Sequence, residues 1–328
     1  MATTRRAFFT SLLMMLAAPI TGHTQQAGKP VRIGDLSGGT AAVNAGLRKA
    51  FIDGLRDHGW IEDRNIAIEY RWQGAGELTF DALAAELVRL PLDLIVAVNT
   101  PAALATKRTG TPLPVVFAQV SEPVATGLVD TLARPGRNVT GLTTINRELM
   151  AERLALLKET IPALTRVGYL ANPGYAVHAV QLAEMGSVAN SLGLTLHLAE
   201  VRAASEIDSA FARVASAQVG ALIVQQDDLL TANRAVIVDR AAKRRLPAMY
   251  VFSLYPESGG LMSYGAQAED LYRRAAHYVD RILKGAKPSE LPVERPNKFE
   301  LVINLRTAKA VGITIPPSLL LRADHVID

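Results

Sequence analysis

Apolar and polar positions alternate along the chain in a regular order of short apolar runs and longer amphipathic segments. The run 31–36 predicts a strand, and apolar residues at four-residue steps from Val43 to Leu55 predict the helix after it, ending near Gly59. The nearly continuous apolar run 92–98 is typical of a strand with helices on both faces of its sheet. Further strands are predicted at 65–70 and 115–118, with helices at 80–90 and 101–107.

The same order of strand and helix repeats after roughly 130 residues, a spacing too long for a solenoid repeat. Strands are predicted at 166–170, 194–199, 221–224 and 248–252, and the helices between them end near 192, 218 and 245. Alternating strands and helices favour parallel sheets with right-handed crossovers. The chain is therefore predicted to form an α/β fold of two Rossmann-like lobes, with ligands binding at the carboxyl ends of the strands.

Three segments can carry the chain between the lobes: 138–144, 259–265 and 292–304. The predicted helix 269–284 then returns to the first lobe. We expect lobe 1 to comprise residues 30–141 and 264–295, and lobe 2 to comprise residues 142–263 and 296–328. Two lobes with facing strand ends form a cleft that can close by hinging.

The N-terminus predicts an export signal. Arg5 and Arg6 precede an apolar stretch, Ala7–Ile20, that is too short to span a bilayer and is followed by small or polar residues. Residues 1–24 are therefore interpreted as a cleaved signal peptide, and the two adjacent arginines favour the twin-arginine route. The mature protein is expected in the periplasm, and loss of two arginines lowers its net charge from +4 to +2.

Composition removes several classes of function. Hydrophobic residues make up 49% of the chain and charged residues 20%, as in ordinary folded proteins. There is no cysteine, which excludes disulfides, thiolate metal sites and cysteine nucleophiles. No concentrated stripe of lysine and arginine suggests nucleic acid as a partner. No later run of 18 apolar residues predicts a membrane span, so the mature protein is expected to be soluble.

Catalytic motifs are absent. The sequence contains no G-x-S-x-G elbow, no H-E-x-x-H, no Walker A loop and no G-x-G-x-x-G after a strand. The six histidines are scattered, and no two share a metal-ligand spacing. We therefore expect no enzymatic activity, no cofactor and no metal.

Two adjacent acids, Asp227 and Asp228, follow the predicted strand 221–224 and leave three interpretations open. They can cap the next helix, bind a ligand amine or perform acid–base catalysis. Glu122, which follows the strand 115–118, presents the same alternatives.

Polar and aromatic side chains recur at equivalent strand ends in both predicted lobes. The glycine turn 37–40 can bring backbone N–H groups close to an anion, although such a turn alone is a weak signal. The argument comes from the set, because side chains at these positions would converge on one cleft. The predicted ligand-binding residues are Ser37, Thr40, Asn99, Thr100, Ser121, Glu122, Asn172, Tyr175, Gln226, Asp227, Asp228 and Tyr255.

Several longer runs carry a family resemblance. They are Phe117–Val124, Gly259–Gly265, Leu271–Ala276, Lys284–Pro288, Lys298–Leu305 and Ile315–Leu320. Through them the chain resembles the periplasmic solute-binding proteins of ABC transporters, in the family typified by the tryptophan-binding TrpX protein. Members often carry aspartate where Glu122 stands, which puts the chemistry of that position in doubt. The resemblance implies a type I periplasmic-binding-protein fold with three crossovers, and an ABC permease and its ATPase as partners.

The resulting hypothesis is a monomeric solute-binding protein that delivers a small organic solute, such as an amino acid or a related compound, to an ABC importer. Ser37, Thr40 and 99–100 would hold its polar or anionic end, Asp227 or Asp228 would pair with an amine, and Tyr175 or Tyr255 would stack on its body. One alternative is a ligand-sensing module for a membrane receptor. Another is a periplasmic hydrolase that uses the acids at 122, 227 and 228.

Overall fold

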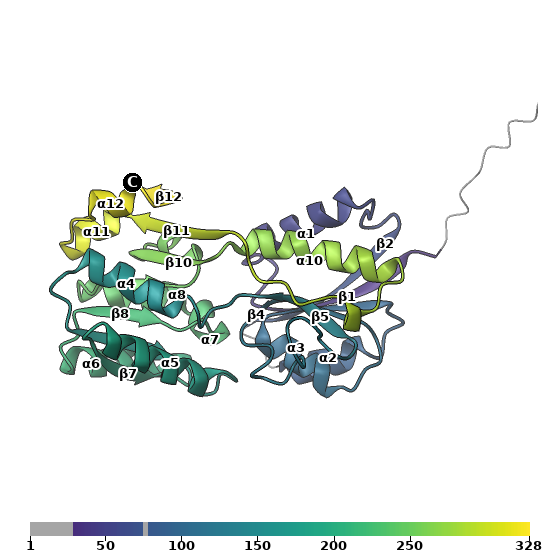
Figure 1. Ribbon diagram of the computed structural model, residues 1–328, viewed down its shortest axis with the longest axis horizontal. Coiled ribbons are helices and arrows are strands. Elements are labelled where there is room, and N and C mark those ends of the chain that lie inside the picture. Colours follow the sequence, from purple (N-terminus) through teal and green to yellow (C-terminus); the bar gives the residue numbers. More distant parts are fainter. Residues whose placement is uncertain (1–28, 75–77) are drawn as a thin grey trace, which may run out of the picture.

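The computed structural model describes residues 29–74 and 78–328. The predicted signal peptide, residues 1–24, lies outside the described residues. Figure 1 shows two lobes side by side, each built on a sheet with helices on its faces. Within the part of the chain that is described, no helix has both the length and the apolar character needed to cross a membrane.

Lobe 1 contains a five-stranded parallel sheet in the order β2-β1-β3-β4-β5. Its strands are β1 Val31–Gly38, β2 Ile66–Gln73, β3 Leu94–Val98, β4 Val115–Val120 and β5 Val139–Thr143. The helices between them are α1 Ala45–Asp57, α2 Phe80–Leu87 and α3 Thr100–Arg108. Every residue of β3 is buried, as its continuous apolar run predicts.

Lobe 2 contains a seven-stranded sheet in the order β12-β11-β10-β9-β8-β6-β7, parallel except where β10 meets β11. Its strands are β6 Arg166–Ala171, β7 Thr195–Glu200, β8 Ala221–Val224, β9 Ala248–Tyr250, β10 Met262–Ala266, β11 Phe299–Asn304 and β12 His325–Ile327. Its helices are α4 Met150–Thr160, α5 His178–Ser191, η1 Ala204–Glu206, α6 Ile207–Ser216, α7 Asp228–Ala232, α8 Arg234–Lys243, α9 Leu254–Glu257, α11 Leu305–Val311 and α12 Pro317–Leu320. The predicted helix 229–245 is thus two helices, because Asn233 leaves helical geometry between α7 and α8.

The chain crosses between the lobes three times. It enters lobe 2 between β5 and α4, returns after β10 into α10 (Ala268–Leu283), and leaves lobe 1 again after η2 (Pro288–Glu290) to form β11. Before that last crossing, Glu294 N donates to Gly141 O at 2.9 Å, so the segment lies against β5. The predicted α/β fold with two lobes, largely parallel sheets and three crossovers is confirmed. Residues 262–266 of the second predicted connection form β10 in the lobe 2 sheet, so the crossing follows that strand.

Helix α10 completes lobe 1, although more than a hundred residues of lobe 2 precede it in the chain. It lies along α1 (Figure 1), and the buried residues Leu271, Ala275 and Val279 belong to the same apolar cluster as Phe51. At Gly54 of α1, an added Cβ would lie only 2.6 Å from the carbonyl oxygen of Arg273 in α10. Glycine at this position therefore lets the two helices approach closely.

Candidate ligand-binding site between the lobes

The carboxyl ends of the strands in lobe 1 face those of lobe 2, and polar side chains from the two lobes touch there. Three of the hydrogen bonds between the lobes join predicted residues to one another: Asn99 Nδ2 donates to Asp228 Oδ2 at 2.9 Å, Tyr175 Oη donates to Thr100 Oγ1 at 3.2 Å, and Ser121 Oγ donates to Gln226 Oε1 at 3.3 Å. Six of the twelve predicted residues therefore meet directly across the interface. Since the lobes bond to each other, the structure is a closed arrangement.

Asn99 is held in an unusual backbone conformation between β3 and α3. Its φ is 79° and its ψ is 167°, a combination that residues other than glycine rarely adopt. The side chain caps α3 by accepting a hydrogen bond from Ala102 N at 2.9 Å, while its Nδ2 reaches Asp228 in the other lobe. Backbone strain of this kind persists only where the surrounding structure enforces it, and it is often found at functional sites.

The two adjacent acids of lobe 2 have different environments. Asp227 caps α7: its Oδ1 accepts from Leu230 N at 3.0 Å and its Oδ2 from Asn172 Nδ2 at 3.0 Å. Asp228 faces lobe 1 instead. Burial, together with the charge of Asp227, raises the pKa of Asp228 to about 7, against the opposing effect of the hydrogen bond from Asn99. Asp227 is therefore the acid that caps α7, whereas the side chain of Asp228 lies at the interface.

The turn after β1 approaches the same point. An added Cβ at Gly38 would lie 2.7 Å from Asn99 Nδ2 and 3.2 Å from Asp228 Oδ1, so glycine is needed for this approach. Ser37 is buried, and its Oγ donates to Asp35 Oδ1 at 2.5 Å. Thr40, in contrast, is exposed at the start of the next turn.

The hydroxyls between the lobes form a buried chain. Ser121 N donates to Thr100 Oγ1 at 2.9 Å, and Ser121 Oγ lies 3.1 Å from Thr144 Oγ1. The Tyr175 ring is buried, and its hydroxyl joins this chain from lobe 2 through Thr100. These groups can present donors and acceptors to a polar ligand, as binding sites require.

Two of the predicted residues have other neighbours. Glu122 is partly buried with a left-handed φ of 51°, and Arg147 Nε lies 3.6 Å from its carboxylate. Burial raises the pKa of Glu122, partly offset by the charge of Arg147. Tyr255 is buried in lobe 2, where its ring stacks on Tyr250 with the centroids 4.3 Å apart. Ligand binding by any of the twelve residues remains a prediction.

Sequence reasoning missed Asp35, which lies inside β1 and is 5% exposed. Burial raises its pKa to about 6, while the hydrogen bond from Ser37 and the charge of Arg48 act in the opposite direction. A lone acid within an apolar strand is the signal that identifies it in the sequence, since such a residue is rarely buried without a reason.

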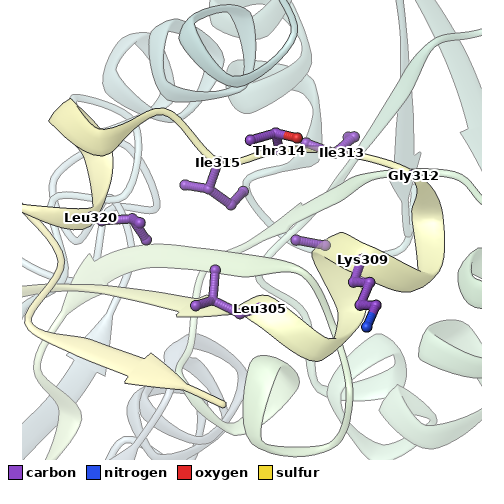
Figure 2. A pocket seen from close by; sticks show the side chains of 8 residues that line it. Leu305, Lys309, Gly312, Ile313, Thr314, Ile315 and Leu320 are labelled. Atoms are coloured by element: carbon purple, nitrogen blue, oxygen red, sulfur yellow. The ribbon is translucent and has the colours of Figure 1, made fainter.

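Two hollows lie away from the twelve predicted residues. Figure 2 shows the larger, of about 460 Å³, bounded by residues of α11 and the segment after it, including Leu305, Ile315 and Leu320. The smaller, of about 230 Å³, lies near Glu300 and His325. Neither includes a residue of the interface described above.

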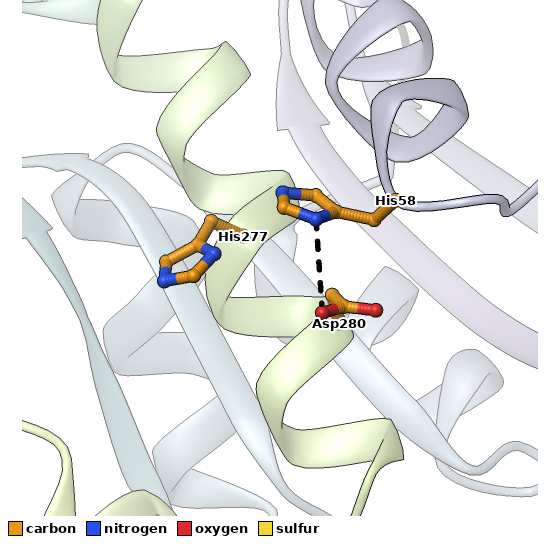
Figure 3. Close-up of side chains that lie close together, drawn as sticks. All are labelled: His58, His277 and Asp280. Carbon is orange, nitrogen blue, oxygen red and sulfur yellow. Dashed lines mark ion pairs between the residues drawn. The ribbon is translucent and has the colours of Figure 1, made fainter.

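A cluster of metal-ligand type joins α1 to α10 in lobe 1. His58, His277 and Asp280 approach one another in Figure 3, with His58 Nδ1 3.7 Å from Asp280 Oδ2. Histidine and carboxylate can bind transition metals, and the search for histidine spacing overlooked this set because it joins distant parts of the chain. Asp280 is already engaged, however, by Lys284 Nζ at 2.7 Å and by Trp60 Nε1 at 2.9 Å. The contacts present therefore describe a structural link, in which the hydrogen bond from Trp60 ties α10 to the segment that follows α1.

Replacing Asp280 with asparagine is expected to lower the free energy of unfolding by about 1–2 kcal/mol at pH 7. Burial alone would raise the pKa of Asp280, but hydrogen bonds from Lys284 and Trp60 outweigh it and hold the pKa below its ordinary value. This stabilisation is present above the unfolded-state pKa near 4 and is lost as the pH falls through the lowered folded-state value.

Urea unfolding at pH 7 and at pH 3 measures the effect, and the difference between Asp280→Asn and the parent protein should shrink at the lower pH. Asp239→Asn is the matched control: its i,i+4 pair with Lys243 is exposed, so this substitution is expected to change stability much less than Asp280→Asn does. Equal changes in the free energy of unfolding for the two substitutions would contradict a larger stabilising role for Asp280.

Comparison with known proteins places this arrangement in a family. The family model described as ABC transporter substrate binding protein matches residues 42–327. A tyrosine-binding protein of Clostridioides difficile (strain R20291) is 26% identical over 266 residues, which cover 81% of this chain and 76% of that protein. An ABC domain from Streptococcus pneumonia, solved in complex with L-Trp, is 28% identical with a TM-score of 0.84, covering 91% of this chain and all of that one.

More distant structures share the fold. A periplasmic binding protein from Burkholderia mallei is 13% identical with a TM-score of 0.60, over 80% of each chain. Together with the two largely parallel sheets and the three crossovers, this confirms the expected type I periplasmic-binding-protein fold. Because the family model spans nearly the whole described chain, the chain belongs to the ABC transporter substrate-binding protein family.

Proposed function

We propose that this chain binds an amino acid or a related amine-bearing solute between its lobes, in the periplasm, and delivers it to its ABC importer unchanged. The observation that carries the proposal is Asp228, an acid held at the lobe interface opposite Asn99. The relatives named for tyrosine binding and solved with L-Trp support an amino acid as the solute class.

The roles of the interface residues follow from their contacts. Asp228 would pair with the solute amine, because its only hydrogen-bond partner in the closed arrangement, among the described residues, is Asn99. The hydroxyls of Thr100 and Ser121 would bond to polar atoms of the solute, and the Tyr175 ring would contact its organic body. Asp227 would hold the start of α7 and so position Asp228.

Delivery requires that the importer distinguish loaded from empty protein. The lobes close through hydrogen bonds of their own, so a solute can favour closure only through contacts that it makes with both lobes in the closed state. We propose that an ABC permease recognises this closed form and that its ATPase drives release. The segment 1–24 would direct export and be removed.

Calorimetry on the mature protein with a panel of amino acids tests the proposal, and mass spectrometry of solute retained through gentle purification identifies the natural ligand. Binding of at least one amine-bearing member, with recovery of that solute unchanged, is expected. The absence of a binding signal with every amino acid, nucleoside, sugar and small organic acid tested would contradict binding. Conversion of the bound solute to a product would indicate a hydrolase.

Binding of an amine-bearing solute is expected to weaken as the pH falls below about 7. The ionised form of Asp228 pairs with a cation, and its pKa of about 7 in the unliganded protein means that protonation competes with binding below that value. The dissociation constant should rise by about tenfold for each unit by which the pH falls in that range, which corresponds to release of one proton when the solute binds. Calorimetry between pH 5.5 and 8.5 measures this slope, and a constant affinity over the range would argue against Asp228 as the amine partner.

A further inference from the structure

Arg153 is a buried cation with no counter-ion among the described residues. It lies in the first turn of α4 and is 3% exposed. Its Nε donates to the carbonyl of Tyr264 at 2.6 Å, and its Nη1 donates to Asn146 Oδ1 at 2.7 Å. Its Nη2 is buried with no hydrogen-bond partner, and no carboxylate of the described residues comes within ion-pair distance of the guanidinium.

An unpaired buried charge is costly, so its retention requires an explanation. Burial lowers the pKa of Arg153 to about 10, which still leaves the guanidinium charged at neutral pH. Carbonyl oxygens satisfy some of its N–H groups but do not neutralise it. Buried charges in proteins are normally paired, and guanidinium is the group best suited to bind a carboxylate through two parallel hydrogen bonds.

A second buried donor lies in the same region. The hydroxyl of Tyr169, on β6, is buried and makes no hydrogen bond of good geometry. Burial raises the pKa of Tyr169, the charge of Arg153 and a long contact with Gln225 lower it, and Tyr175 and Asp227 raise it. The hydroxyl of Tyr169 therefore interacts electrostatically with both Arg153 and Asp227.

One residue that holds Arg153 lies close in the chain to the lobe interface. Asn146, which accepts from Arg153, follows Thr144 by two residues. Thr144 Oγ1 contacts Ser121 Oγ, and Ser121 contacts Gln226 across the lobes. Arg153 is thus held by a residue two positions along the chain from a hydroxyl of the site proposed above, and Tyr169 belongs to the strand whose carboxyl end leads to Asn172 and Tyr175.

We propose that Arg153 is a ligand-binding residue: its free Nη2 edge, with the hydroxyl of Tyr169, holds a carboxylate of the bound solute. This inference rests on the proposed function, and it assigns an anionic group to the solute in addition to the amine. A solute carboxylate would supply the missing counter-ion and would make the loaded form the electrically balanced one. Sequence reasoning assigned the anionic end to Ser37, Thr40 and 99–100; Arg153 offers what those residues lack, a full positive charge.

The test compares acids with their neutral amides. L-Tryptophan, L-tyrosine, tryptophanamide and tyrosinamide are titrated by calorimetry into the parent protein and into Arg153→Gln. The parent should bind each acid about 10- to 100-fold more tightly than its amide, the range expected for a charge-assisted hydrogen bond. In Arg153→Gln this preference should fall to near unity. Arg166→Gln, an exposed arginine at the start of β6, is the matched control and should preserve the preference.

A purely structural role for Arg153 predicts a different result. It would weaken acid and amide equally and leave their ratio unchanged, and that outcome overturns the inference. So does a parent protein that binds amides as tightly as acids, although the proposed function would survive it. If the parent binds none of the four, this inference fails, and the proposed function fails with it only if the wider panel of amino acids also gives no binding.

Tyr169→Phe decides the matter if Arg153→Gln does not fold. It removes a single hydroxyl, for which the described residues offer no hydrogen bond of good geometry, so the core keeps its shape. The acid should then bind about 3- to 10-fold more weakly while the amide is unaffected. Unchanged affinity for the acid would overturn the subsite.

Discussion

Replacing Asp228 with asparagine is expected to weaken binding of the amine-bearing solute about 100-fold or more and, at the same time, to stabilise the empty protein at neutral pH. Loss of one partner of a buried charge pair accounts for the first effect. The second follows from the raised pKa. A carboxyl group whose pKa is about 7 when folded and near 4 when unfolded destabilises the protein increasingly as the pH rises between those values.

Asparagine carries no charge and retains an acceptor for Asn99, so this penalty disappears in the variant. We expect a gain of about 1–3 kcal/mol in the free energy of unfolding at pH 7.5 and none at pH 4. Calorimetry measures the affinity and urea unfolding measures the stability. Asp208→Asn, an exposed acid on α6, should leave the affinity unchanged. A variant that binds normally, or that is less stable than its parent at pH 7.5, would contradict the assignment.

Replacing Gly141 with alanine is expected to destabilise lobe 1 by about 3 kcal/mol or more. Gly141 lies in β5 with a φ of 151°, and an added Cβ would lie 2.0 Å from the carbonyl oxygen of Phe117 in β4. The pairing of β4 with β5 shifts register just after Phe117, and this irregularity brings the two backbones close together. Backbone atoms cannot move aside as a flexible side chain can, so the strands must separate.

Gly186→Ala is the matched control for this substitution. Gly186 lies in the interior of α5, and an added Cβ meets no atom within 4 Å. Alanine should stabilise that helix by about 0.5–1 kcal/mol. Urea unfolding of both variants measures the contrast, and a Gly141→Ala protein as stable as its parent would show that β4 and β5 can separate at little cost.

The alternation of strands and helices was predictable because it depends on local periodicity alone. Strand ends converge by the geometry of parallel sheets, so residues such as Asn99, Ser121 and Gln226 could be grouped before their contacts were known. Val43 shows the limit of this reasoning. It fits the four-residue apolar spacing, yet it is 47% exposed, because the chain forms a turn there and α1 begins only at Ala45.

What depends on distant contacts could not be predicted. In the sequence, Arg153 is one cation in an amphipathic helix, and such residues usually face solvent. Contacts between distant parts of the chain bury it, among them the hydrogen bond to the carbonyl of Tyr264 in β10. Likewise, Asp35 becomes a candidate once burial and its bond to Ser37 are known. The contact of His58 with Asp280 depends on the return of α10 to lobe 1. The order of the elements suggests this return, but it does not fix which residues of α10 face α1.

Because α10 returns to lobe 1 late in the sequence, lobe 1 cannot finish folding during synthesis until most of lobe 2 has been made. A nascent chain that ends before residue 268 holds all five strands of lobe 1 but not the helix that covers Phe51 and its neighbours. The apolar face beside α1 then stays open to water and to other chains while the whole first part of lobe 2 is made. A ribosome-bound or truncated chain of this length should therefore bind chaperones and be cleaved readily by proteases, and resistance should appear once α10 has been added.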